Sequence, residues 1–382
     1  MTLATGRGRT SQTQPWIRTS LALALILAIP SLFLLCTGPV AQIFRLDQLS
    51  ESPPNLSPEV VSRTPMAFGF CYSPTGDRLV VSTELGAEIW DAATLRMRQT
   101  IDSHRAFFCS WSPDGSRIAF AGPGEGEVTI AIPGSNRTDR ASIPTWCSMG
   151  LAWLGDRDLV LSSELQISIV RLVDGQDGLN ASTLYSFSAI RTCAQVSGWP
   201  GVRFTCPATA CKDGGMIAAS LRCETNQQRE CLVIWDTATL QPVLWLDPCA
   251  ESWNNQSGTL QAEEERQEYV WVWVVRLEWS PSSNELAYLS NRGLGIWSIE
   301  NRAGQISATH RTIGLRNEVE AFAWSPDGKR IVAASRSALF IIDLGTGSSY
   351  SRTLPVSSSW ISGSTKNRLE WSPDGETIAF LD

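Results

Sequence analysis

Histidine, basic residues and catalytic motifs are scarce in this chain of 382 residues. Its two histidines, His104 and His310, leave it poor in the side chain that most often acts as general base or metal ligand. Its 31 Lys and Arg against 38 Asp and Glu give a net charge of −7, which offers no basic surface to a phosphate backbone. The motifs of serine hydrolases, zinc proteases and nucleotide-binding loops are also absent. The sequence therefore predicts no cofactor, no metal site, no nucleic-acid partner and no catalysis.

Charged side chains make up only 18% of the chain, below the roughly 25% of an ordinary soluble domain. Hydrophobic residues make up 43%, and 29 Gly with 20 Pro provide abundant material for turns. This composition excludes a disordered or coiled-coil chain. It favours an all-β fold in which many short strands are joined by tight turns.

One uncharged stretch near the N-terminus is long enough to cross a bilayer. No charged residue occurs from Thr19 to Phe44, and residues 21–36 are apolar apart from Pro30 and Ser31. About 20 apolar residues suffice for a membrane-spanning helix. The stretch therefore predicts one transmembrane helix before the body of the chain.

The charges on either side of this stretch indicate its orientation. Three arginines and no acid precede it, whereas one arginine and two acids follow closely, and positive flanks stay in the cytoplasm. We expect residues 1–18 to form a short cytoplasmic N-terminus, residues 19–44 a single-pass signal anchor, and the rest to lie on the extracytoplasmic side of the membrane. A cleaved signal peptide and a buried core helix are the alternatives. Pro39 interrupts the small residues after the stretch and leaves no A-x-A cleavage site, which favours a retained anchor.

Ten cysteines agree with an exported body, because disulfides persist in oxidising compartments. Cys71 and Cys109 lie inside apolar strands and suit buried reduced thiols. Six others are close together without the C-x-x-C spacing of a metal site, and a bridge between Cys223 and Cys231 would suit a hairpin. The candidate disulfide cysteines are Cys193, Cys206, Cys211, Cys223, Cys231 and Cys249.

A short pattern recurs along the chain. FCSWSPDGSRIAFAG at 108–122, FAWSPDGKRIVAAS at 322–335 and LEWSPDGETIAFLD at 369–382 match nearly residue for residue. Variants of the turn stand at 73–76 and 280–283, and degenerate copies that begin at Leu151 and Ala208 raise the number to seven. The complete turn motifs are Ser112, Pro113, Asp114 and Gly115; Ser325, Pro326, Asp327 and Gly328; and Ser372, Pro373, Asp374 and Gly375.

Each motif predicts a tight turn between two strands. Proline presets φ near −65°, the aspartate side chain can bond its own backbone, and glycine adopts the positive φ that ends the turn. A further strand, often ending in Ile-Trp-Asp, follows in several copies. Four strands in roughly 40 to 45 residues is the period of a propeller blade.

The F-x-W-S-P-D-G-x-x-I-A-F pattern and the Ile-Trp-Asp endings resemble the WD-repeat β-propellers, and more closely the WD-like repeats of the TolB-type propellers of bacterial envelopes. The resemblance covers residues 66–382 and is specific to the fold rather than to a function. It implies a seven-bladed β-propeller. The Gly-His pair that begins a WD repeat is only approximated here, by Ser103-His104.

The seventh unit of the repeat is half complete, because Asp382 follows its second strand and six and a half blades result. An unclosed ring would expose strand edges. Residues 45–65 are therefore either a linker or a closing segment, with 58–62 as the expected outer strand.

Two functions from different classes remain open. The leading one is a membrane-anchored, extracytoplasmic module that binds or scaffolds a protein or another ligand without catalysis. The alternative is a propeller-type enzyme, a lyase or a glycan hydrolase, with carboxylates at the central channel. An insertion at 251–269 leads into Tyr269, Trp271 and Trp273, which alternation places on one face of a strand, as an aromatic binding ledge or as packing between blades.

The charge asymmetry generates a test of topology. Protease added to intact cells or spheroplasts should digest the body of the chain and leave residues 1–18 protected, because the arginines hold that end inside. Protection of the whole chain would contradict the predicted orientation.

Overall fold

The computed structural model describes most of the chain from Ala41 onward. The chain divides into two compact units, residues 1–38 and 39–382, and every described residue belongs to the second. The described residues are 41–45, 59–60, 67–102, 106–122, 126–135, 137–143, 149–175, 178–189, 202–223, 230–248, 252–253, 273–302, 305–313, 315, 319–335, 338–353 and 369–381.

The strands in these ranges form seven antiparallel sheets. The first three contain β3 (Ala67–Tyr72), β4 (Arg78–Thr83), β5 (Gly86–Asp91) and β6 (Met97–Asp102); β7 (Phe108–Trp111), β8 (Ile118–Ala121), β9 (Glu127–Ala131) and β10 (Thr138–Ser142); and β11 (Gly150–Leu154), β12 (Asp158–Ser162), β13 (Gln166–Gly175) and β14 (Gly178–Ser188).

The next three sheets follow in chain order, and the seventh combines strands from both ends of the described chain. The fourth contains β15 (Val202–Phe204), β16 (Thr209–Ala210), β17 (Met216–Cys223), β18 (Glu230–Asp236) and β19 (Pro242–Leu246); the fifth β20 (Ser252–Trp253), β21 (Val274–Trp279), β22 (Glu285–Ser290), β23 (Gly293–Arg302) and β24 (Gln305–Ile313); the sixth β25 (Val319–Trp324), β26 (Arg330–Ser335), β27 (Ala338–Asp343) and β28 (Ser349–Thr353); and the seventh β2 (Glu59–Val60), β1 (Ala41–Arg45), β30 (Thr377–Leu381) and β29 (Leu369–Trp371).

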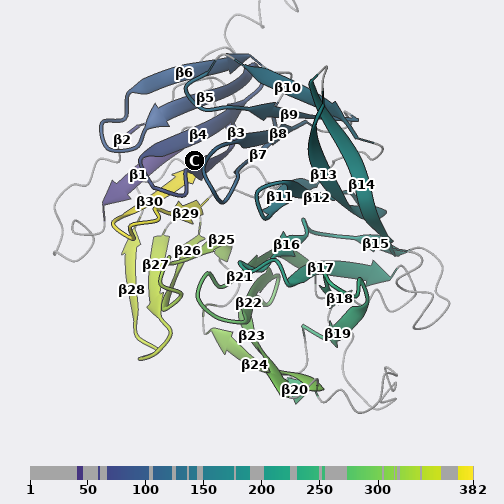
Figure 1. Cartoon of the computed structure of the whole chain (residues 1–382). Coiled ribbons are helices and arrows are strands. Elements are labelled where there is room, and N and C mark those ends of the chain that lie inside the picture. The colour runs from purple at the N-terminus through teal and green to yellow at the C-terminus, as the bar shows by residue number, and fades with distance from the viewer. Residues whose placement is uncertain are drawn as a thin grey trace, which may run out of the picture. The chain divides into compact units, whose positions relative to one another are not determined.

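The first strand of each sheet contacts the first strand of the next. The contacts run from β3 to β7, β11, β16, β21, β25 and β29, and β30 returns to β3 (Figure 1). The series is therefore closed, and the chain folds as an all-β β-propeller, as the repeat predicted.

The core lies between neighbouring sheets. The second strands are apolar and buried along nearly their whole length, as in β8, because a sheet packs on each of their faces. Aromatic side chains at the ends of the first strands fill the same layers: Trp324 packs with Ala287 and Ile296, and Trp371 packs with Val332.

The seventh sheet corrects the predicted N-terminal boundaries. β1 pairs with β30 from Ala41 opposite Leu381 to Arg45 opposite Thr377, and β2 pairs with the outer edge of β1. β2 falls within the expected 58–62 strand. β1 occupies residues 41–45, which the sequence analysis assigned mainly to the anchor, because an apolar stretch predicts a helix and a buried strand equally well.

The expected transmembrane helix has no counterpart among the residues that the structure describes: none of their helices is long and apolar enough to span a bilayer. Residues 19–40, the greater part of the predicted anchor, lie outside the described ranges.

Indole groups join neighbouring sheets through hydrogen bonds. Trp153 Nε1 donates to the carbonyl of Ser110, Trp279 Nε1 to that of Thr209, and Trp324 Nε1 to that of Glu278, at 2.9, 3.3 and 3.1 Å. Each acceptor lies in the first strand of the preceding sheet, or in β16 for the fourth. The indole nitrogens of Trp111 and Trp371 are buried without such a partner.

This difference between tryptophans generates a stability prediction. Trp324→Phe should lower the free energy of unfolding by about 1 kcal/mol more than Trp371→Phe, because both lose similar buried volume but only the first leaves the Glu278 carbonyl without its indole donor. Urea denaturation of the two variants measures the difference. Equal losses would show that the indole bond adds nothing to the junction.

Candidate functional site

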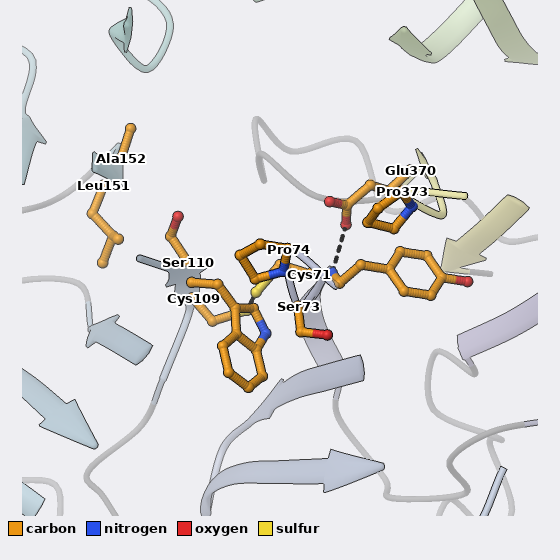
Figure 2. A pocket seen from close by; sticks show the side chains of 11 residues that line it. Cys71, Ser73, Pro74, Cys109, Ser110, Leu151, Ala152, Glu370 and Pro373 are labelled. Carbon is orange, nitrogen blue, oxygen red and sulfur yellow. Dashed lines mark hydrogen bonds between the residues drawn. The ribbon is translucent and has the colours of Figure 1, made fainter. Parts of the chain in front are cut away.

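A cavity of about 350 Å³ lies where the first strands of four sheets meet the turns that follow them (Figure 2). Its polar groups are the carboxyl of Glu370, the thiols of Cys71 and Cys109, and the hydroxyls of Ser73 and Ser110. The other lining residues are Tyr72, Pro74, Trp111, Leu151, Ala152 and Pro373.

The repeat explains why these residues reach the cavity. Successive side chains of a strand point to opposite faces, so the aromatic end of each first strand packs between sheets and the preceding residue turns toward the cavity. That preceding residue is Cys71 in β3, Ser110 in β7, Ala152 in β11 and Glu370 in β29. One variable position of the repeat therefore contributes a residue from each of these four strands to the cavity wall.

Glu370 is the acidic group of the cavity. Its Oε2 accepts a hydrogen bond from the backbone N–H of Tyr72 at 3.3 Å, across the junction between β29 and β3. Burial, and to a smaller extent the charge of Glu278, raise the pKa of Glu370 to about 8, against the opposing effects of the Tyr72 N–H and Arg276. The carboxyl therefore carries a proton at neutral pH and can donate a hydrogen bond to a ligand.

Glu278 stands at the same repeat position in β21, in a different setting. Its Oε2 accepts a hydrogen bond from the Arg276 guanidinium at 3.0 Å, and its Oε1 accepts one from the backbone N–H of Trp324 at 3.4 Å. The Arg276 guanidinium lies over the ring of Phe322. Glu278 is thus paired with the Arg276 cation, whereas Glu370 accepts its hydrogen bond from a neutral backbone N–H.

The two thiols of the cavity touch each other. Cys71 Sγ donates to Cys109 Sγ at 3.4 Å, and both side chains are buried. Burial and the neighbouring sulfur raise the pKa of Cys71 well above its ordinary value, so this thiol is protonated at neutral pH.

The predicted turn motifs hold the first two strands of their sheets together. In all three complete copies the serine hydroxyl donates to the aspartate two residues on and accepts the backbone N–H five residues on, and the glycine has φ near +70°. The hydrogen bond from Ser325 lowers the pKa of Asp327. These polar groups are engaged within the turns, so they form structure rather than a ligand site.

The candidate disulfide cysteines are only partly described. No disulfide joins Cys206, Cys211 and Cys231 to one another. In the β17–β18 ladder Cys231 lies opposite Leu221, so the register does not place it opposite Cys223 as a hairpin bridge would need. Cys193, Cys249 and the side chain of Cys223 lie outside the described residues, and disulfides there stay a prediction.

Cys211 has a role that the disulfide hypothesis missed. It occupies the place of the turn serine in the fourth sheet: its Sγ donates to Asp213 Oδ1 at 2.8 Å and accepts the Met216 N–H at 2.9 Å. Burial and the bond to Asp213 raise the pKa of Cys211 to about 11. The signal was present in the alignment of ACKDGG with WSPDG.

Glu278 and Glu370 were not among the site residues predicted from the sequence. Both occur in R-L-E-W, where the other copies have alanine, serine, threonine or cysteine at the matching position. A charged residue in an otherwise apolar strand was the available signal, because such a residue is retained in the interior only with a partner or a cavity.

No family model and no curated protein matches this sequence. Solved structures match its fold. The β-propeller domain of Myceliophteria thermophila Cps50 (Swd1) aligns with a TM-score of 0.60 and 16% identity over 82% of this chain and 95% of that chain. Kuenenia stuttgartiensis hydrazine synthase aligns with a TM-score of 0.55 and 13% identity over 81% and 90%.

A third similar structure is that of a mitotic checkpoint complex, with a TM-score of 0.52 and 17% identity over 89% of this chain and 92% of that chain. At these identities the likeness shows the β-propeller fold alone. It agrees with the WD-repeat resemblance of the turns.

The raised pKa of Glu370 generates a prediction about pH. The unfolded chain loses this proton near pH 4.5 and the folded chain near pH 8, so the free energy of unfolding should fall as pH rises between these values. Glu370→Gln should reduce this fall, as measured by urea denaturation at pH 5, 6, 7 and 8.

Glu376→Gln is the matched control, because Glu376 is exposed in the turn that follows β29. It should keep the pH dependence of the wild type. An unchanged slope in Glu370→Gln would show that the carboxyl titrates normally.

Proposed function

We propose that this chain is a membrane-anchored, extracytoplasmic propeller of the WD-like, TolB-type kind that binds a protein partner and does not catalyse a reaction. The observation that carries the proposal is Trp273, a large aromatic side chain that remains 44% exposed. Exposed tryptophans are frequent anchors of protein interfaces.

The backbone holds Trp273 in place. Its N–H donates to Asn291 Oδ1 at 3.0 Å, and its carbonyl accepts the Asn291 N–H at 3.2 Å. Val275, two residues on and therefore on the same side of the strand, is 38% exposed. A backbone that is already held loses little conformational entropy on binding, so this segment suits an interface.

Trp273 lies on the face opposite to the Ser-Pro-Asp-Gly turns, because it precedes β21 and the turn at 280–283 follows that strand. Leu85 and Leu165, in the β4–β5 and β12–β13 turns, belong to the same opposite face and are 75% and 60% exposed. Tyr269 and Trp271 of the expected aromatic ledge lie outside the described residues. One structure with a similar fold belongs to a protein complex, which supports a protein partner here.

Two features support a membrane anchor and a seventh blade in this proposal: the apolar stretch near the N-terminus and the sheet that combines strands from both ends of the described chain. The apolar residues 21–36 fall wholly within the first unit, before residue 39, so an anchor there would leave β1 to the propeller. The arginines before the apolar stretch support export of the body. The seventh sheet, composed of β2, β1, β30 and β29, serves as the seventh blade in this proposal.

A crosslinking pull-down from the native membrane tests partner binding. Trp273→Ala should lose a crosslinked partner that the wild type retains, because its anchor is removed. Tyr350→Ala is the matched control, since Tyr350 is a 70% exposed aromatic in the outer strand β28. Equal recovery of every partner by the wild type and Trp273→Ala would refute binding through this face.

The second candidate function is a propeller-type enzyme, and Glu370 favours it. Glu370 is a protonated carboxyl in a cavity, and its pKa is raised in part by the charge of Glu278, which is ion-paired with Arg276. One protonated and one ionised carboxyl are the combination that general acid and base catalysis uses. One of the similar folds, hydrazine synthase, is that of an enzyme. Turnover abolished by Glu370→Gln and unaffected by Trp273→Ala would select this function over the binding module.

A further inference from the structure

Cys71 and Cys109 belong to different sheets, yet their sulfurs are in contact. Cys71 lies in β3 and Cys109 in β7, 38 positions apart in sequence, and their Sγ atoms are separated by 3.4 Å. The side chains are 5% and 3% exposed. Figure 2 shows the two thiols meeting at the wall of the cavity.

The cavity gives reagents access to this pair. Both cysteines line it, together with Ser73 and Ser110, and its volume of about 350 Å³ is of the size that holds small molecules. Exposure to bulk solvent is low for both sulfurs, so a reagent must enter the cavity to reach them.

We propose that Cys71 and Cys109 form a redox modification site, in which a small-molecule disulfide converts the two thiols into one disulfide that links the first two sheets of the propeller. The proposal does not depend on partner binding or on export. It requires only the geometry of β3 and β7 and a disulfide reagent.

The reaction balances as two thiol–disulfide exchanges. The thiolate of one cysteine attacks a reagent RSSR, which forms a mixed disulfide and releases one RS⁻. The second cysteine loses its proton to solvent, attacks the protein sulfur of the mixed disulfide and releases the second RS⁻. The protein loses two protons and two electrons, and RSSR takes up both to become two RSH.

The geometry favours the second step. The sulfurs must approach by only about 1.4 Å to reach a disulfide bond length, a distance that side-chain rotation can provide. The raised pKa of Cys71 leaves little thiolate at neutral pH. The exchange should therefore be slow at pH 7 and accelerate several-fold at pH 9.

Mass spectrometry of the full-length protein tests the proposal. The protein is reduced, freed of reductant, incubated with oxidised glutathione at pH 8.5, alkylated under denaturing conditions and digested with trypsin without reduction. Cys71 is the only cysteine of tryptic peptide 64–78, and Cys109 is the only one of peptide 106–117. We expect these peptides to appear linked, two hydrogens lighter than their sum.

Cys71→Ser and Cys109→Ala are the controls, and neither should yield the linked species. The oxidised wild type should melt at least about 4 °C higher than the reduced protein, a rise that both variants should lack. Recovery of both wild-type peptides as alkylated thiols, as glutathione adducts, or linked to other cysteines would overturn the proposal.

Discussion

The pairing of β1 with β30 is the constraint on which the propeller depends. β29 and β30 alone form a hairpin with an open outer edge, and open edges invite association with other chains. β1 covers that edge over five residue pairs and closes the sheet that lies between β25 and β3. The turns then meet across the closing junction: a Cβ on Gly76 would lie 3.3 Å from the ring of Pro373, a tight contact, and the φ of +76° favours glycine there. The cavity forms at the same junction, with Glu370 and Pro373 on one side and Tyr72 on the other.

Local chemistry made the repeat predictable. Each Ser-Pro-Asp-Gly turn is stabilised by bonds that span at most five residues, so the sequence specifies it without knowledge of its neighbours. The closing strand was not predictable in this way, because β1 pairs with a strand more than 330 residues away and follows an apolar stretch.

The contact between Cys71 and Cys109 was not predictable from the repeat, because the two cysteines stand at different repeat positions. Cys71 is one place before the aromatic end of its strand, and Cys109 is two places before it. Only the packing of β3 against β7 brings the two positions together.

The two faces of the propeller differ in chemistry. The turn face has a cavity whose ionisable groups, Glu370 and Cys71, are protonated at neutral pH, so it can bind a polar ligand through hydrogen bonds without a net charge. The opposite face has Trp273, Leu85 and Leu165, which are apolar and exposed. The proposed protein interface and the cavity lie on different faces, so different variants test them. Trp273→Ala and Glu370→Gln therefore separate the binding module from the enzyme.

Comparison of two truncated chains tests ring closure most directly. One chain begins at residue 39, where the propeller unit starts, and retains β1; the other begins at residue 47 and lacks it. If β1 closes the ring, the shorter chain should melt at a lower temperature, and its β30 amides, at 377–381, should lose protection from hydrogen exchange that they keep in the longer chain. Equal melting temperatures and equal protection of these amides would contradict closure by β1.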